Sequence, residues 1–233
     1  DPVGNGAVEV EGAPASTGTF EVLVTAEDPA GATAATDLTI RVFDPADVIT
    51  EGFETGLSSD WTSVSGFTTT TGQAIEGSRS LHSTTGSPHA RWEPDALAGG
   101  EKIQQIRLAW RELTYQTGFG VTLRDPSGNQ VLTLAGDNPQ WDLSDGSYCC
   151  QYVGDTNDDG GASYGRWVSY TVTFDWDAGT YDYKIAVPAS GHTVTGTYDL
   201  DSVQGVERID LGDWSEQSRS MSDFWMDDVR IVR

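Results

Sequence analysis

An alternation of apolar and polar residues with a period of two is the feature that most constrains this chain. Residues 19–24 (TFEVLV), 38–42 (LTIRV) and 170–174 (YTVTF) alternate in this way, as half-buried strands do. Asp-Pro, Ser-Gly and Gly-Asp pairs, which favour turns, separate such runs. Residues 101–112 have a composition that suits a helix, but their apolar spacing favours a strand. The sequence therefore predicts an all-β fold of many short strands, arranged as an antiparallel sandwich.

The charge of the chain excludes two classes of partner. The 36 acidic residues outnumber the 13 basic ones and give a net charge of −23, and Lys102 and Lys184 are the only lysines. Such a surface repels nucleic acid and anionic membranes and needs counter-ions to stay compact. No run approaches the roughly 18 apolar residues of a membrane span. The composition is similar to that of proteins from salt-loving archaea; an ordinary acidic secreted protein that collects divalent cations is the alternative.

A domain boundary is expected at Asp44–Pro45. The segment before it contains GTFEVLVTAEDPAGATAATDLTIRVFD, which resembles the C-terminal half of the cadherin-like (Ig-like) modules of microbial surface proteins. The resemblance implies that residues 1–44 form a partial β module. Three strands are too few to bury a core. Docking on the following domain is the first expectation, and pairing with another chain or a truncated array are the alternatives.

Residues 45–233 are expected to form the second domain. Three groups of motifs carry a resemblance to laminin-G-like, concanavalin-type jelly rolls: EGFETGLSSDW with GSRSLHS, then RWVSYTVTFDWDAGTYDYKIAV, then ERIDLGDW with FWMDDVRIV. The resemblance implies a jelly-roll β-sandwich. An insertion at about residues 135–165 has no counterpart in that family.

The stretch DTNDDGG at residues 155–161 predicts a calcium loop. Its Asp, Asn, Asp and Gly occupy positions 1, 3, 5 and 6, as in loops whose alternate side chains converge on a hard cation. Position 12 is Arg166 where an EF-hand has a bidentate Glu, so the expected site is an isolated β loop; a solvated acidic turn is the alternative. The expected ligands are Asp155, Asn157, Asp159, Gly161 and Ser163.

A second calcium site is implied by the jelly-roll resemblance. In that family the Glu of the opening Phe-Glu pair and an Asp of the closing Asp-Asp-Val strand meet at a structural cation. The matching residues here are Glu54, Asp227 and Asp228. Adjacent strand residues face opposite ways, so the sequence leaves open which Asp binds. The alternative is a surface salt bridge between Asp228 and Arg79 or Arg230.

The insertion combines aromatic and acidic residues, as sugar-binding loops do. We interpret it as the ligand-binding surface; packing within a large loop is the alternative. Elsewhere Trp110, Trp167 and Trp225 lie in apolar strand patterns and are expected in the core. The predicted ligand-binding residues are Trp141, Tyr148, Tyr152 and Tyr164.

The only cysteines, Cys149 and Cys150, are adjacent within the same insertion. A vicinal disulfide, two free thiols and bridges to another chain all remain open.

Enzyme signatures are missing from the sequence. The Glu-x-Asp-x-x-Glu motif of glucanases with this fold does not occur, and His82, His89 and His192 lack metal-binding spacing. We therefore expect a calcium-stabilised, extracellular or cell-surface module for non-catalytic recognition, with a glycan or a cell-surface molecule as partner. A self-assembling surface subunit that uses strand complementation and a polysaccharide-degrading enzyme are the alternatives.

Overall fold

The structure is a computed structural model that describes residues 15–83, 88–112, 118–137, 140–144, 151–155, 165–201, 204–212 and 224–233. The chain divides into two compact units, Asp1–Val48 and Ile49–Arg233. The described helical turns are two short 3-10 segments, η1 (Pro45–Asp47) and η2 (Asp95–Leu97). No described helix could cross a membrane.

The first unit is a two-stranded antiparallel hairpin, β1 (Gly18–Glu27) and β2 (Thr33–Val42). Asp28 closes its turn, because the carboxylate accepts the backbone amides of Ala30 and Ala32 at 2.8 and 2.9 Å. Most side chains of both strands are exposed.

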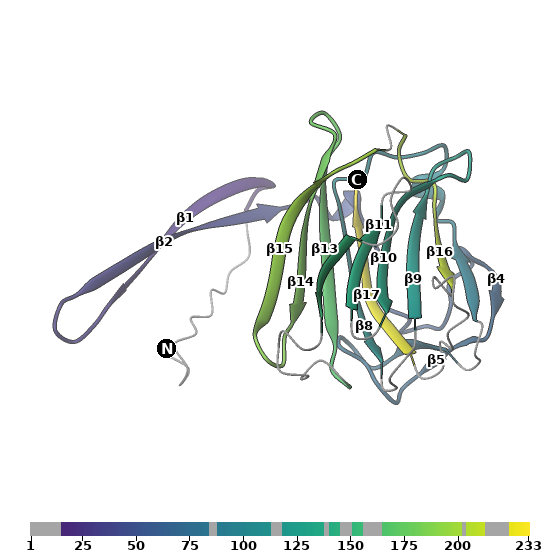
Figure 1. Cartoon of the computed structure of the whole chain (residues 1–233), viewed down its shortest axis with the longest axis horizontal. Helices are drawn as coiled ribbons and strands as arrows, with labels where there is room; N and C mark the ends of the chain where they lie inside the picture. The colour runs from purple at the N-terminus through teal and green to yellow at the C-terminus, as the bar shows by residue number, and fades with distance from the viewer. Residues whose placement is uncertain are drawn as a thin grey trace. The chain divides into compact units, whose positions relative to one another are not determined.

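The second unit is a sandwich of two antiparallel sheets (Figure 1). The seven-stranded sheet has the order β12-β11-β10-β9-β16-β7-β4, and the eight-stranded sheet has the order β15-β14-β13-β8-β17-β6-β5. The additional strand β3 (Val48–Glu51) pairs with β17. The prediction of an all-β antiparallel jelly-roll fold is therefore confirmed, and residues 105–112 form a strand.

The strands of the seven-stranded sheet are β4 (Trp61–Ser65), β7 (His89–Trp92), β9 (Gly118–Arg124), β10 (Gln130–Asp137), β11 (Gln140–Ser144), β12 (Gln151–Asp155) and β16 (Arg208–Gly212). Those of the eight-stranded sheet are β5 (Phe67–Thr70), β6 (Ser80–Ser83), β8 (Gln105–Glu112), β13 (Val168–Asp175), β14 (Thr180–Val187), β15 (His192–Asp199) and β17 (Phe224–Val232).

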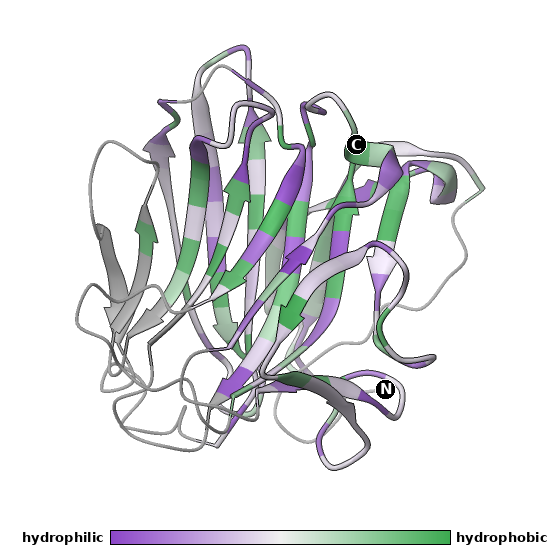
Figure 2. Cartoon of the chain, turned by 90° about the vertical axis from the view of Figure 1, so that its right-hand side faces the viewer, coloured by the Kyte–Doolittle hydropathy of each residue, from purple (hydrophilic) through white to green (hydrophobic). Residues whose placement is uncertain are grey.

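The core lies between the two sheets. Apolar and polar residues alternate along the strands, as the banding in Figure 2 shows, and in β13 every second residue is buried. The hydroxyl of Tyr170 on β13 donates to the carbonyl of Ala135 on β10 at 2.9 Å and so joins the two layers. Trp110 and Trp225 are buried as predicted, whereas the prediction for Trp167 is wrong, because this residue precedes β13 and is only half-buried.

Candidate functional site

A β-bulge in β17 brings two adjacent carboxylates into the interior. The register with β8 runs from Asp227 opposite Ala109 to Arg230 opposite Arg107, so β17 has one residue more than its partner. Asp228 has a φ of 52°, in the left-handed region. As a result Asp227 is 0% exposed and Asp228 5%, although neighbours on a regular strand would face opposite sides of the sheet.

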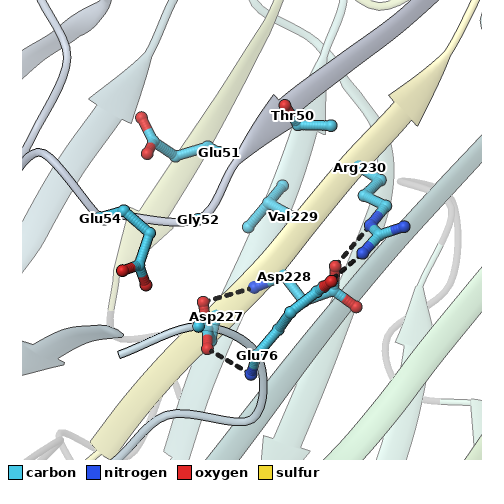
Figure 3. A pocket seen from close by; sticks show the side chains of 10 residues that line it. Thr50, Glu51, Gly52, Glu54, Glu76, Asp227, Asp228, Val229 and Arg230 are labelled. Atoms are coloured by element: carbon cyan, nitrogen blue, oxygen red, sulfur yellow. Dashed lines mark hydrogen bonds and ion pairs between the residues drawn. The ribbon is translucent and has the colours of Figure 1, made fainter. Parts of the chain in front are cut away.

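Both carboxylates line a pocket of about 490 Å³ at the junction of β3 and β17. Three segments form its walls: residues 50–54, residues 76–77 and residues 227–230. The structure thus brings together Glu54, Asp227 and Asp228, which the sequence singled out. In Figure 3 the carboxylate of Asp227 points to the side of β17 on which Glu54 lies, and that of Asp228 points toward Arg230.

Asp227 is held by main-chain amides. Its Oδ2 accepts the amides of Ile75 and Glu76 at 3.0 and 3.2 Å, and its Oδ1 accepts the amide of Asp228 at 2.8 Å. In the described part of the chain no Lys or Arg forms an ion pair with it. Burial raises the pKa of Asp227 above its ordinary value of 3.8, and the three amides oppose this shift. In the described structure the negative charge of Asp227 is therefore stabilised by partial charges alone, and the neighbouring Asp228 carboxylate opposes it.

Asp228 is held by two arginines. Arg107 Nη2 lies 2.9 Å from Asp228 Oδ2, and Arg230 Nε lies 2.5 Å from Asp228 Oδ1. Burial raises the pKa of Asp228, as does its hydrogen bond with Glu76, while the two arginines oppose the shift. The alternative, a surface salt bridge of Asp228 with Arg79 or Arg230, is confirmed for the pairing with Arg230. It is wrong for Arg79, which donates to Thr69 at 2.9 Å, and wrong about the surface, because the Asp228 carboxylate is buried.

Glu54 reaches across to the segment that precedes β6. Its Oε1 accepts the amides of Ser78 and Arg79 at 2.8 and 2.9 Å, and its Oε2 accepts the Ser78 hydroxyl at 2.7 Å. These three donors hold the pKa of Glu54 below its ordinary value of 4.5. Gly77, with a φ of +63°, lines this contact so closely that a Cβ there would lie 2.4 Å from Glu54 Oε1.

Two carboxylates of the pocket keep oxygen sites of the kind that a hard cation such as calcium prefers. A carboxylate offers about four lone-pair sites, and Glu54 and Asp227 each use three of them. Each therefore retains about one oxygen site, whereas Asp228 is neutralised by arginine. The described residues contain no group of three or more His, Cys, Asp or Glu placed to hold a metal, so the remaining ligands of a cation here would be backbone oxygens or waters.

The other predicted site residues belong to the insertion. Its described strands β11 and β12 extend the edge of the seven-stranded sheet. Trp141 lies in β11, and Tyr152 and Asp155 lie in β12; only their backbone is described. Outside the described residues lie Asn157, Asp159, Gly161, Ser163, Tyr148, Tyr164, Cys149 and Cys150.

The sequence analysis missed a second charged cluster, on the outer face of the seven-stranded sheet. Asp210 on β16 contacts Arg91 on β7, Arg124 on β9 and Arg208 on its own strand. The alternation in HARW and RIDLG places these residues on the polar side of their strands. Nothing local in the sequence pairs β7, β16 and β9, so the convergence could not be predicted.

No family model and no curated protein match the chain. Among solved structures, the winged bean acidic lectin complexed with methyl-α-D-galactose matches at 10% identity and a TM-score of 0.49 over 79% of this chain and 97% of the lectin. The galectin LEC-6 of Caenorhabditis elegans matches at 8% and 0.40 over 61% and 89%, and the Crh5 transglycosylase at 14% and 0.47 over 80% and 84%.

Proposed function

We propose that this protein is an extracellular, calcium-stabilised recognition module that binds glycans and does not catalyse a reaction on them. The observation that carries the proposal is the pocket at β3 and β17, which Glu54 and Asp227 both line and in which Asp227 is buried with no ionic partner among the described residues. Each carboxylate there is fixed by amides, a hydroxyl or arginines. Carboxylates immobilised in this way are better placed to stabilise the fold than to act as general acids or bases.

The cation would connect the beginning and the end of the sandwich. Glu54 follows β3, and Asp227 lies on β17, so a calcium ion held by both, with backbone oxygens, would link segments far apart in the sequence. Asp228 stays with Arg107 and Arg230 in this assignment. The bound ion would supply the positive charge that Asp227 lacks. We retain DTNDDGG as a second proposed calcium loop.

Glycan recognition is assigned to the insertion at about residues 135–165. Aromatic rings offer flat apolar faces for the C–H faces of sugars, and acidic or amide side chains accept hydroxyl protons. The insertion has both kinds of residue. Its described strands β11 and β12 continue the seven-stranded sheet, and sites carried by strands are more precise than sites on loops.

A glycan array probed in calcium and then in chelator tests the proposal. We expect binding to a subset of glycans that weakens when calcium is removed, because bound calcium stabilises only the folded state. Equal binding in calcium and in chelator would show that glycan recognition does not depend on calcium. Blank arrays in both conditions would overturn recognition itself.

Self-assembly is a second candidate, favoured by the hairpin β1–β2. Its large apolar residues Phe20, Leu23 and Leu38 are exposed, and a two-stranded hairpin leaves both edges open for pairing. Oligomers or filaments that grow with protein concentration, measured by light scattering and microscopy, would support this function. A monomer at high concentration would exclude it.

A further inference from the structure

The charged cluster on the seven-stranded sheet lies on its outward face. Trp92, Leu123 and Ile209 are buried neighbours of the cluster residues and belong to the core between the sheets. Because side chains alternate along a strand, their charged neighbours project the other way. Asp210 is register partner of Arg91, and Arg208 is register partner of Arg124. We name Arg91, Arg124, Arg208 and Asp210 the arginine cluster.

Asp210 is the hub of the arginine cluster. Its Oδ1 lies 3.0 Å from Arg91 Nε and 3.4 Å from Arg208 Nε, and its Oδ2 lies 2.5 Å from Arg124 Nε. The arginine side chains remain accessible, with exposed fractions of 39% for Arg91, 31% for Arg124 and 19% for Arg208. One carboxylate thus orients three guanidinium groups that solvent can reach.

The arginine cluster carries more positive charge than its own structure needs. Three arginines face one aspartate, and Glu93 lies only as near as 4.0 Å to Arg91. Arg208 and Arg124 are directly opposite each other on neighbouring strands, an arrangement of like charges that destabilises a sheet. The chain has a net charge of −23, yet among the described residues Asp210 and Glu93 are the only acids that form ion pairs with the cluster.

Several N–H donors of the arginine cluster remain for a further ligand. Arg91 and Arg124 face Asp210 through Nε, and among the described residues Arg124 Nη1 has a partner in the Gly128 carbonyl at 3.1 Å. Arg124 Nη2 and the terminal nitrogens of Arg91 and Arg208 have no hydrogen-bond partner in the described structure. Planar guanidinium groups with free N–H donors bind carboxylate and sulfate groups bidentately.

We infer that the arginine cluster binds the anionic substituent, carboxylate or sulfate, of an acidic glycan. The inference rests on the proposed function and narrows its ligand class. The acidic surface of the rest of the protein repels a polyanion. An acidic glycan would therefore bind at the arginine cluster and not elsewhere on that surface. The same sheet ends in β11 and β12, so the described strands of the predicted sugar-binding insertion share a sheet with the anion site.

The test measures binding to three immobilised polymers: hyaluronan, which carries carboxylates, dextran sulfate, which carries sulfates, and neutral dextran. The variants are Arg91→Gln, Arg124→Gln and, as a matched loss of one positive charge, Lys184→Gln on the exposed side of β14 in the other sheet. Calcium is kept constant, and circular dichroism with Tm verifies that each variant is folded. A neutral and acidic glycan array of the wild type accompanies the series.

We expect the wild type to bind hyaluronan or dextran sulfate over dextran, and the polymer that binds identifies the anionic group. Each arginine variant should lose about tenfold or more in affinity, while Lys184→Gln keeps wild-type binding. If Arg91→Gln and Arg124→Gln fold and bind as the wild type does, or if only neutral glycans bind, the anion site is overturned and the proposed function stands. A wild type that binds no glycan of either kind overturns both.

Discussion

At the residue scale, two neighbouring aspartates are stabilised by different means. Asp227 accepts three backbone amides, and Asp228 pairs with two arginines. Arginine satisfies a buried carboxylate fully, since it brings both charge and hydrogen bonds. Amides bring hydrogen bonds alone. The two residues should therefore respond differently to the loss of their charge and to a divalent cation.

Asp227→Asn should abolish the thermal stabilisation of the protein by calcium at its pocket. Calcium at a concentration of one hundred times its Kd would stabilise the fold by about 2.7 kcal/mol. For a domain of this size, that corresponds to a rise in Tm of roughly 5–10 °C. Calorimetry in calcium and in chelator measures the rise. Asp228→Asn is the control, and it should lower Tm in both conditions because it removes the ionic partner of Arg107 and one of the two ionic partners of Arg230. An undiminished calcium response in Asp227→Asn would assign the ion to another site.

Glu54→Gln should destabilise the protein at neutral pH and not in acid. The folded-state pKa of Glu54 is lowered from 4.5, so its carboxylate stabilises the fold above that value, and the stabilisation is lost as the pH falls through the folded pKa. The Tm difference between wild type and variant, measured in chelator, should be constant near neutrality and shrink below pH 4.5. The same substitution at exposed Glu101 is the control. A difference that stays constant into acid would contradict this role.

At the element scale, the segment before β6 and the bulge of β17 support each other. Ile75 and Glu76 donate their amides to Asp227, and Ser78 and Arg79 donate theirs to Glu54. One short loop thus uses two pairs of adjacent amides, on either side of Gly77, to hold two carboxylates from opposite ends of the unit. The backbone must turn sharply to do so, which explains the positive φ of Gly77.

Gly77→Ala should destabilise the sandwich more than Gly99→Ala does. Both glycines have positive φ, at +63° and +87°, and a Cβ in this region costs about 1–2 kcal/mol. At Gly77 the Cβ also meets the Glu54 carboxylate at 2.4 Å, whereas at Gly99 nothing lies within 4 Å. Urea unfolding of both variants measures the difference, and equal losses would show that the Glu54 contact is loose.

The sequence predicts the strands themselves better than it predicts their register and their order in the sheets. Period-two alternation locates β1, β2 and β13, and the motifs around Glu54 and Asp227 predict that distant segments meet. The bulge that buries Asp228 depends on how β17 pairs with β8, which no local pattern encodes. Likewise, Arg91 and Arg124 meet only because β16 lies between β7 and β9.

At the scale of the whole molecule, charge repulsion opposes compactness. With a net charge of −23, raising sodium chloride from about 0.1 to about 1 M shortens the Debye length from about 10 to about 3 Å and should raise Tm. Calorimetry in chelator, repeated with potassium chloride, tests this and separates screening from a specific ion effect. A Tm that stays constant or falls as salt is added would mean that repulsion between the acidic residues does not destabilise the fold.

The pairing of β3 with β17 has a mechanical consequence. These strands are the first and the last of the second unit, so tension applied through its two ends is transmitted first to this pair and only afterwards to the sheets. A cation bound by Glu54 and Asp227 would cross-link the segments on either side of this strand pair. The force needed to open the unit would then depend on the calcium concentration around it.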